Sequence, residues 1–517
     1  MSATVLVVGL DACEVTLVDR WAGEGLLPNF ARLHASSCIV DLDGPMTSLP
    51  GAIWPEINTG RSAAKDGHFY VPNRLRTGEA RLRATRVDEI DAEHYFWTVA
   101  SRAGRRVAVI DPVQAVPARD FNGVQLFEWG LHDRAFSVQS DPPELLAALR
   151  ARFGDHPVQS CDRHGETREG YRALRDGLLR GLAAKATFAP ELLAGERWDL
   201  FDCTISESHC GGHQFWHFGD PRHPWHAREC ADDLRHALRD IYQGIDRTLG
   251  RLVDAAGRGA TVLAVFSHGM DLYYDGPQLL PEVLARLGYA SGGRNRAAAW
   301  MRVLKRNVTH WPRPLKAAIK RVARSNAITA PIGAAGCLVD PFESVRTRAA
   351  YVSNNRCGAI RLNIKGREPH GCVEAGNDAR TLMHALKREL SALRDPASGE
   401  PIMAEVFTAD ERFGANHHAD VPDIICVFRT DLGMLENCES PAVGHVHAPI
   451  YHPHAPRSGD HTSHSQCWAS GAGIGPGAGP TRAHVRDIAA TVLHRLGVDR
   501  PAWLDGKALV LSARQAA

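Results

Sequence analysis

The feature that most constrains the fold is a set of three short apolar runs, each of which stops shortly before polar residues. The runs are residues 5–8, Leu200–Ile205 and Thr261–Phe266. The polar residues that follow them are Asp11, Glu207, Ser208, His209, Ser267 and His268. Short continuous apolar runs are typical of parallel strands that are buried on both faces. Open α/β sheets gather their sites at the carboxyl ends of such strands, so we expect these polar side chains to converge.

Two of the histidines, His209 and His213, are four residues apart. On a helix this spacing places both rings on one face, with roughly 5–6 Å between their Cβ atoms. Neutral imidazole is a common ligand of zinc and of other late first-row metals. The chain contains 26 histidines, so a pair with this spacing also arises by chance. The histidine and aspartate segments elsewhere in the chain favour the interpretation as a metal site.

The sequence pattern divides the 517 residues into four segments. We expect a catalytic α/β core over residues 1–290, a basic helical insertion over 291–345, an inserted α+β cap subdomain over 346–430, and a return to the core over 431–517. The basic stretch 292–325 also carries one amphipathic apolar face. It is consistent with a solvated helix on the core, a lid over an anionic substrate, or a contact with a membrane surface or a partner.

The charge balance excludes some classes of protein. Lysine and arginine total 60 and aspartate and glutamate 59, which disfavours a bulk nucleic-acid-binding protein. The chain has no apolar stretch near the roughly 20 residues that a transmembrane helix needs. Its first residues lack the basic region and cleavage site of a signal peptide, and its 12 cysteines form no C-x-x-C pair. We therefore expect a cytoplasmic protein without a transmembrane segment, and the oligomeric state stays open.

Several further segments occur in a distinctive order along the chain. They are Gly9-Leu10-Asp11, residues 28–33, residues 47–54, Asn58-Thr59-Gly60, Gly67-His68, residues 360–369, Ser458-Gly459-Asp460-His461, residues 471–477 and residues 486–491. In this order they resemble the alkaline phosphatase superfamily, specifically its type I phosphodiesterase/nucleotide pyrophosphatase branch. The resemblance implies an alkaline-phosphatase-like central, mostly parallel sheet flanked by helices, with a smaller inserted α+β cap subdomain. It also implies a metal-dependent hydrolase that cleaves a phosphate ester.

The resemblance assigns the nucleophile to a serine or threonine before the Pro-x-x-x-Trp segment of this chain. Ser48 fits that place, and Thr47 is the alternative. A serine hydroxyl is a weak nucleophile near pH 7 unless a base or a metal favours its alkoxide. In the competing interpretation, Ser48 only caps a helix that begins near Pro50.

One metal site of the family takes an Asp-x-x-x-His pair and a late histidine. In this chain His213 and His461 hold the two histidine places, and His209 replaces the aspartate. Three imidazoles favour zinc, so the resemblance implies one firmly bound Zn²⁺. Glu207 and His464 are further candidates, either as ligands or as hydrogen-bond partners of ligands.

The other metal of the family lies beside the nucleophile. The resemblance gives it Asp11, Ser48 and His268, but Ser267 stands where the family has an aspartate. Loss of a carboxylate weakens the binding of a divalent cation. Asp271 is a candidate replacement, and whether a second divalent ion binds stays open.

Three arginines in the predicted cap are candidate ligands of an anionic substrate: Arg356, Arg361 and Arg367. Salt bridges within the cap are the alternative. We expect a small-molecule phosphoester substrate and favour a phosphodiester over a monoester. Two other functions stay open, namely a transferase that moves a phosphoryl-type group to an alcohol or amine, and a catalytically silent metal-binding protein. The chain has no C-x-P-x-R sulfatase motif and no P-loop motif.

Overall fold

The computed structural model describes most of the chain. The described residues are 4–67, 77–78, 89–131, 136–161, 167–226, 232–273, 275–290, 342, 346–354, 356–448, 457–480 and 482–511. His68 and the basic stretch 292–325, with nearly all of the predicted insertion, lie outside them. Among the described helices, none is long and apolar enough to span a membrane.

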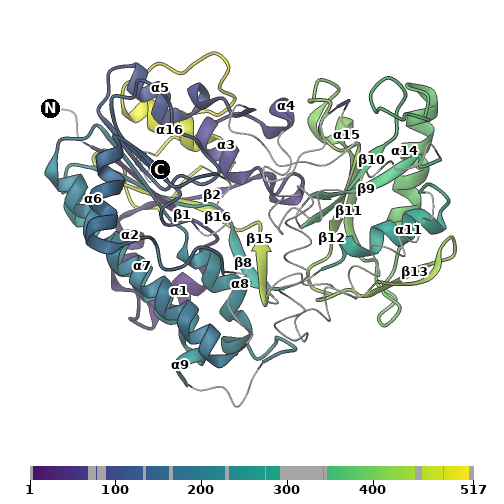
Figure 1. Cartoon of the computed structure of the whole chain (residues 1–517), viewed down its shortest axis with the longest axis horizontal. Coiled ribbons are helices and arrows are strands. Elements are labelled where there is room, and N and C mark those ends of the chain that lie inside the picture. Colours follow the sequence, from purple (N-terminus) through teal and green to yellow (C-terminus); the bar gives the residue numbers. More distant parts are fainter. Residues whose placement is uncertain are drawn as a thin grey trace, which may run out of the picture.

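A nine-stranded mixed sheet forms the centre of the larger part of the molecule, the core (Figure 1). Across the sheet, the strands are β17 (Gly477–Ala478), β2 (Cys38–Leu42), β16 (Ser465–Ser470), β7 (Thr261–Phe266), β1 (Val5–Leu10), β6 (Leu200–Ile205), β3 (Val107–Ile110), β4 (Gly123–Phe127) and β5 (Gln139–Asp141). β7, β1, β6, β3 and β4 run parallel, whereas β16 and β5 are antiparallel to their neighbours. The three predicted strands are therefore adjacent at the centre.

Helices cover both faces of this sheet, because the side chains of its central strands are mostly apolar and are buried on both sides. In β1, Leu6, Val8 and Leu10 point to one face, and Val5 and Val7 point to the other. The first face packs against α1 (Val15–Gly23), α2 (Pro28–Ser36), α6 (Pro143–Phe153), α7 (Arg168–Gly195), α8 (Glu207–Gly219) and α10 (Ala237–Ala256). The second packs against α3 (Ile53–Thr59), α5 (Phe96–Arg102) and α16 (Asp487–Arg495). The predicted α/β class with a mostly parallel sheet is confirmed.

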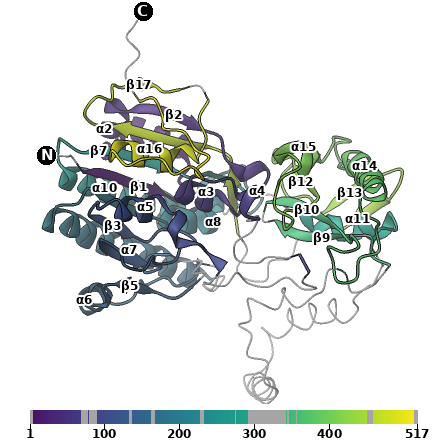
Figure 2. The same cartoon turned by 90° about the horizontal axis from the view of Figure 1, so that it is seen from above.

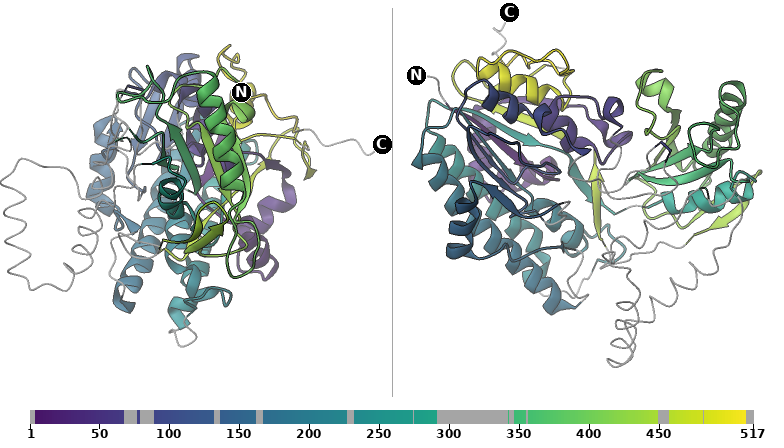
Figure 3. Two further views of the ribbon diagram at one scale, coloured as in Figure 1. Left: turned by 90° about the vertical axis from the view of Figure 1, so that its right-hand side faces the viewer. Right: turned by 45° about the horizontal axis from the view of Figure 1, so that its top comes forward.

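The smaller part of the molecule, the cap, lies beside the core (Figure 2). Its antiparallel sheet has the order β11 (Met403–Thr408), β12 (Ile424–Phe428), β10 (Cys357–Leu362) and β9 (Ala349–Asn354). α14 (Asn377–Ser391) packs on this sheet on the side away from the core (Figure 3). The other face of the sheet meets the core, where Phe407 and Ile425 share a buried cluster with Leu49 and Ala52.

The apolar centre of the cap extends beyond the predicted range of residues 346–430. On the amino-terminal side it includes α11 (Leu280–Arg286), and on the carboxyl-terminal side the hairpin of β13 (Asn437–Ser440) and β14 (Gly444–His447). The leucines of α11 pack against the cap strands, although the helix directly follows core sequence.

The chain passes between core and cap through a two-stranded antiparallel ribbon, β8 (Gly269–Leu272) and β15 (Gly459–Thr462). In Figure 1 this ribbon lies between the two parts. β8 follows β7 directly, and β15 precedes β16. The ribbon therefore starts at the carboxyl end of the central strands.

Smaller elements complete the described structure. They are α4 (Ala63–Asp66), α9 (Asp232–Arg235), α15 (Ala409–Phe413) and the 3₁₀ helices Pro45–Thr47, Ala92–His94 and Pro277–Leu279. α4 and α15 are the helices through which core and cap face each other in Figure 1.

Candidate active site

The polar residues predicted to converge do follow adjacent strands. Asp11, His209 and His268 come after β1, β6 and β7, which are paired in parallel. The Asp11 backbone N–H donates to the Ile205 carbonyl at 3.0 Å, and the Ser267 N–H donates to the Leu10 carbonyl at 3.2 Å. The parallel pairing thus places all three side chains at one edge of the sheet.

Three histidines form a buried group at this edge. His209 and His213 lie on one face of α8, with ring centroids 4.4 Å apart. His461, from β15, places its Nε2 atom 3.0 Å from the Nε2 atom of His209. One ring nitrogen from each of the three lies within 4.8 Å of the others. Such a group can hold a metal ion, as predicted for these residues.

A close backbone approach brings His461 to α8. A Cβ atom on Gly459 would lie 2.4 Å from the carbonyl oxygen of Gly212, so only glycine fits there. His213 adds a contact across the same junction, with its Nδ1 atom 2.7 Å from the Gly459 carbonyl oxygen. That carbonyl oxygen accepts a hydrogen bond from the Nδ1–H group, which leaves the Nε2 lone pair for a metal.

Burial keeps the imidazole of His461 neutral near pH 7. Burial and the neighbouring His268 hold the pKa of His461 well below its usual range. A neutral imidazole offers the lone pair that a metal ion requires.

His268 borders the three-histidine group. Its ring centroid lies 4.4 Å from that of His461 and 6.3 Å from that of His209. Burial and the charge of Arg356 lower the pKa of His268 to about 3. Its buried Nε2 atom has no hydrogen-bond partner among the described residues. His268 therefore presents a neutral ring nitrogen next to the group.

Ser267 stands where the family resemblance led us to expect an aspartate. It is buried, and its hydroxyl hydrogen-bonds to backbone groups. Its Oγ atom lies 2.9 Å from Nδ1 of His268 and 3.3 Å from the Leu10 carbonyl oxygen, to which it donates. It also accepts from the Ala12 N–H at 3.4 Å. The hydroxyl thus ties the ends of β1 and β7 together and orients His268.

Asp11 is a buried carboxylate with a partner from α3. Its Oδ1 atom accepts from the Trp54 indole N–H at 2.7 Å. Its carbonyl accepts from the hydroxyl of Ser208 at 2.6 Å, on the first turn of α8. Asp11 thereby connects the helix that carries the histidines with the helix that follows Ser48.

Ser48 directly follows the 3₁₀ helix Pro45–Thr47 and is buried. Its hydroxyl lies 3.3 Å from the Pro45 carbonyl oxygen. The helix after it, α3, begins at Ile53 with Ala52 at its N-cap position, so the alternative that Ser48 caps this helix is wrong. Thr47, the alternative nucleophile, is the last residue of the 3₁₀ helix.

The cap hairpin between β9 and β10 connects the Ser48 loop with the histidines. Asn354 at the end of β9 donates through its side-chain amide to the Ser48 carbonyl at 2.8 Å. Two residues later, Arg356 lies close enough to His268 and His461 for its charge to lower the pKa of both rings. Of the three predicted arginines, Arg356 is the one that faces this site.

The other two arginines are paired inside the cap. Arg361 is fully buried and donates to Glu368 at 2.8 Å. Arg367 donates to Glu368 at 2.8 Å and to Asp423 at 2.7 Å. Both therefore fit the alternative interpretation as salt bridges within the cap.

The three further candidate ligands have other partners. Glu207 is buried beside Nε2 of His156 at 3.4 Å, and although burial opposes it, the charge of Lys185 lowers the pKa of Glu207. Asp271 is half-exposed and pairs with Arg222 at 3.0 Å. His464 lies 3.2 Å from Glu14. None of the three belongs to the histidine group.

Two features of the site were missed in the sequence. Arg457, four residues before His461, places its Nη1 atom 3.4 Å from Nε2 of His213. Asp111 follows β3 as Asp11 follows β1, and it pairs at 3.2 Å with the fully buried Lys185. The apolar run of β3, closed by Asp111, is the same signal that revealed the other strands.

Residues 5–449 match the family model of type I phosphodiesterase/nucleotide pyrophosphatase. The chain belongs to this family. The predicted resemblance is therefore confirmed, and members of the family are metal-dependent phosphoester hydrolases. No curated protein matches the sequence.

Solved structures of similar fold cover nearly the whole chain. Phosphonoacetate hydrolase from Sinorhizobium meliloti 1021, solved with phosphonoformate and with phosphonoacetate, is 15% identical and has a TM-score of 0.50. The match covers 96% of this chain and 95% of that chain. Murine ectonucleotide pyrophosphatase/phosphodiesterase 5 is 12% identical with a TM-score of 0.45, over 96% of each chain.

Proposed function

We propose that this protein is a zinc-dependent phosphodiesterase in which Ser48 is the nucleophile. The observation that carries the proposal is the buried group of His209, His213 and His461 at the carboxyl edge of the central strands, in a chain of this family. We favour a phosphodiester over a monoester as the substrate.

The residues present fit a bound zinc ion. Three imidazole nitrogens within 4.8 Å of one another match the preference of zinc for nitrogen ligands. A catalytic zinc site needs three protein ligands and leaves one position for water or substrate. When bound, the ion supplies positive charge for a developing oxyanion and lowers the pKa of a bound water.

Three residues of the chain have separate roles in the proposed reaction. Ser48 loses its hydroxyl proton as Oγ forms a bond to phosphorus, the bond from phosphorus to the leaving oxygen breaks, and that oxygen takes up a proton to leave as an alcohol. Water then bonds to phosphorus, the bond from phosphorus to Oγ breaks, and Ser48 regains its proton. Arg356 contributes a positive charge that balances the anionic phosphoryl group. The amide of Asn354 holds the Ser48 loop in place through the Ser48 carbonyl.

A second ion is the open part of this proposal. Asp11, His268 and Ser48 supply one carboxylate, one imidazole and one hydroxyl, and the hydroxyl of Ser267 adds no charge. We propose one firmly held zinc and a second ion that binds only weakly.

Turnover of bis(p-nitrophenyl) phosphate by the zinc-loaded protein tests the nucleophile. We expect Ser48→Ala to lower kcat by at least about 10³-fold, because the variant has no hydroxyl to attack phosphorus. Thr47→Ala is the matched control and retains activity. If Thr47→Ala abolishes turnover and Ser48→Ala does not, Thr47 is the nucleophile.

The same assay separates the other two functions. A transferase produces a new phosphodiester when an alcohol or amine is added, which product analysis detects. A silent metal-binding protein holds zinc and turns over no phosphoester.

A further inference from the structure

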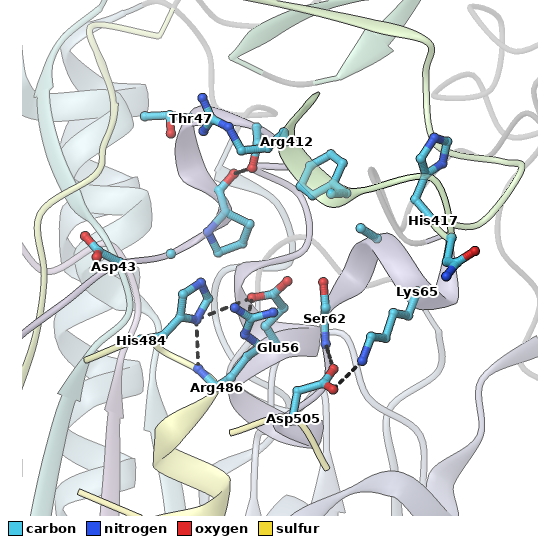
Figure 4. A pocket seen from close by; sticks show the side chains of 16 residues that line it. Asp43, Thr47, Glu56, Ser62, Lys65, Arg412, His417, His484, Arg486 and Asp505 are labelled. Carbon is cyan, nitrogen blue, oxygen red and sulfur yellow. Dashed lines mark hydrogen bonds and ion pairs between the residues drawn. The ribbon is translucent and has the colours of Figure 1, made fainter. Parts of the chain in front are cut away.

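A polar cavity of about 630 Å³ lies between the core and the cap (Figure 4). Its core side is lined by Glu56 of α3, and its cap side by Arg412 of α15. Thr47 and Ser48 also line it. The cavity therefore adjoins the candidate nucleophile, and its size suits one small organic group.

Glu56 is the most informative side chain of this cavity. It is 4% exposed, and its Oε1 atom accepts from the Ala63 N–H at 2.8 Å. Its Oε2 atom has no hydrogen-bond partner among the described residues. The nearest ring nitrogen of His484 and the guanidinium of Arg486 lie 3.6 and 3.7 Å from this atom (Figure 4). A buried carboxylate oxygen in this state is an acceptor that a ligand can satisfy.

The protonation states support an acceptor role for Glu56. Burial lowers the pKa of His484 to about 4, so this ring is neutral near pH 7. Burial raises the pKa of Glu56 to about 7, and the charge of Arg486 opposes that rise. A hydroxyl suits both forms of the carboxyl group, because a hydroxyl donates and accepts hydrogen bonds.

The rest of the lining mixes donors and acceptors. Lys65 pairs with Asp505, and the Arg412 guanidinium donates to Glu405 at 2.6 Å outside the cavity lining. The carboxylates of Asp43 and Asp505 disfavour an anion with several charges. The ring of Phe413 adds an apolar face.

We propose that this cavity binds a polyhydroxylated alcohol, such as a sugar or polyol, that is esterified in the phosphoester substrate. One of its hydroxyl groups donates to Oε2 of Glu56, and its C–H face packs on Phe413. The inference rests on the proposed function only for the placement of the ester next to Ser48.

Two matched diesters test the selectivity: the p-nitrophenyl phosphodiester of the glucose 6-hydroxyl and p-nitrophenyl methyl phosphate. Both release nitrophenolate, and they differ only in the hydroxylated alcohol. We expect the ratio of kcat/KM for the glucosyl over the methyl diester to exceed ten in the wild-type protein. Glu56→Gln should lower this ratio by about 10- to 100-fold, the range for a hydrogen bond to a charged group. A wild-type ratio near one overturns the proposal.

Two further variants make the result specific. Glu374→Gln, an exposed glutamate of the cap that pairs with Lys365, should leave the ratio unchanged. Asn416→Ala changes an exposed cavity residue, where the cost in stability is small, and should lower the ratio. An unchanged ratio in both Glu56→Gln and Asn416→Ala overturns the proposal.

Direct binding separates this inference from the proposed function. Saturation-transfer NMR with methyl α-glucoside needs no turnover, and we expect transfer in the wild-type protein and its loss in Glu56→Gln. Transfer without any diesterase activity supports the cavity and contradicts the proposed function. Diesterase activity without saturation transfer, and with a ratio near one, supports the proposed function and contradicts the inference about the cavity. If millimolar inorganic phosphate alone displaces the glucoside, the cavity is an anion site instead.

Discussion

The hydroxyl of Ser267 performs a structural task at the position where the family resemblance led us to expect a metal-binding carboxylate. Because it contacts the Leu10 carbonyl, the Ala12 N–H and His268, it holds the ends of β1 and β7 together. We expect Ser267→Asp to raise bound zinc from about one to about two per chain, since the added carboxylate completes the set of Asp11 and His268. Elemental analysis after exhaustive dialysis measures this ratio.

Ser267→Ala is the control for this experiment. It removes the same hydrogen bonds, about 1 kcal/mol each, without adding a ligand. An equal metal content in the two variants means that Asp11 and His268 do not share an ion.

Glu56 makes stability depend on pH. Its pKa is about 7 in the folded protein and near 4.5 in the unfolded chain. Because the folded pKa is the higher one, the contribution of Glu56 to stability is present below pH 4.5 and is lost as the pH rises through 7. Glu56→Gln stays neutral, so its stability relative to the wild type should rise by about 3 kcal/mol between pH 4.5 and pH 8.

Thermal unfolding of both proteins across this pH range measures the effect, and the comparison cancels the titration of all other groups. If the stability of the variant and that of the wild type change equally with pH, the pKa of Glu56 is the same in the folded and the unfolded protein.

Among the elements, β15 can lie this close to α8 because Gly459 has no Cβ atom. We expect Gly459→Ala to push β15 away from α8, because the new Cβ atom would lie 2.4 Å from the Gly212 carbonyl oxygen. The displacement separates His461 from His209 and His213, so zinc binding should fall at least about tenfold, which equilibrium dialysis measures. Gly23→Ala, in α1 with nothing within 4 Å, should bind zinc like the wild type.

The elements also show what the sequence can predict. β1, β6 and β7 were predictable because each is a short and mostly apolar run, although β6 also buries Asp202 and Thr204. The convergence of Asp11, His209 and His268 followed from the parallel order of the three strands. The three histidines were placed together on the strength of the family resemblance.

Other features depend on partners that are distant in the chain. Arg356, Arg361 and Arg367 look alike in sequence. In the fold, Arg361 and Arg367 pair with Glu368, and Arg367 also pairs with Asp423, which separates both from Arg356. The apolar face of α11 is a pattern that a helix of either the core or the cap shows. The sequence therefore could not show that the cap begins at this helix, inside the segment predicted as core.

At the scale of the whole molecule, a metal ion held by both His209 and His461 would join segments that are about 250 residues apart in sequence. A ligand that binds only the folded state stabilises it, by about 2.7 kcal/mol when present at 100 times its Kd. We therefore expect chelation of zinc to lower the thermal midpoint of unfolding by several degrees, as differential scanning calorimetry would show.

His461→Ala and His464→Ala are the matched pair for this measurement. The first should unfold at the same temperature with and without chelator, because it lacks a ligand. The second should respond like the wild type, since His464 contacts Glu14 instead of the group. A response to chelator in His461→Ala would place the stabilising metal elsewhere.

The ribbon of β8 and β15 has a consequence for how such proteins diversify. Leu272 and Gly459 are directly paired, so the chain leaves and rejoins the core at a single point. A segment inserted between adjacent residues of a hairpin can be exchanged without changing the connectivity of the sheet. Recombination at this junction can thus exchange the cap and leave the strands that carry the three histidines unchanged.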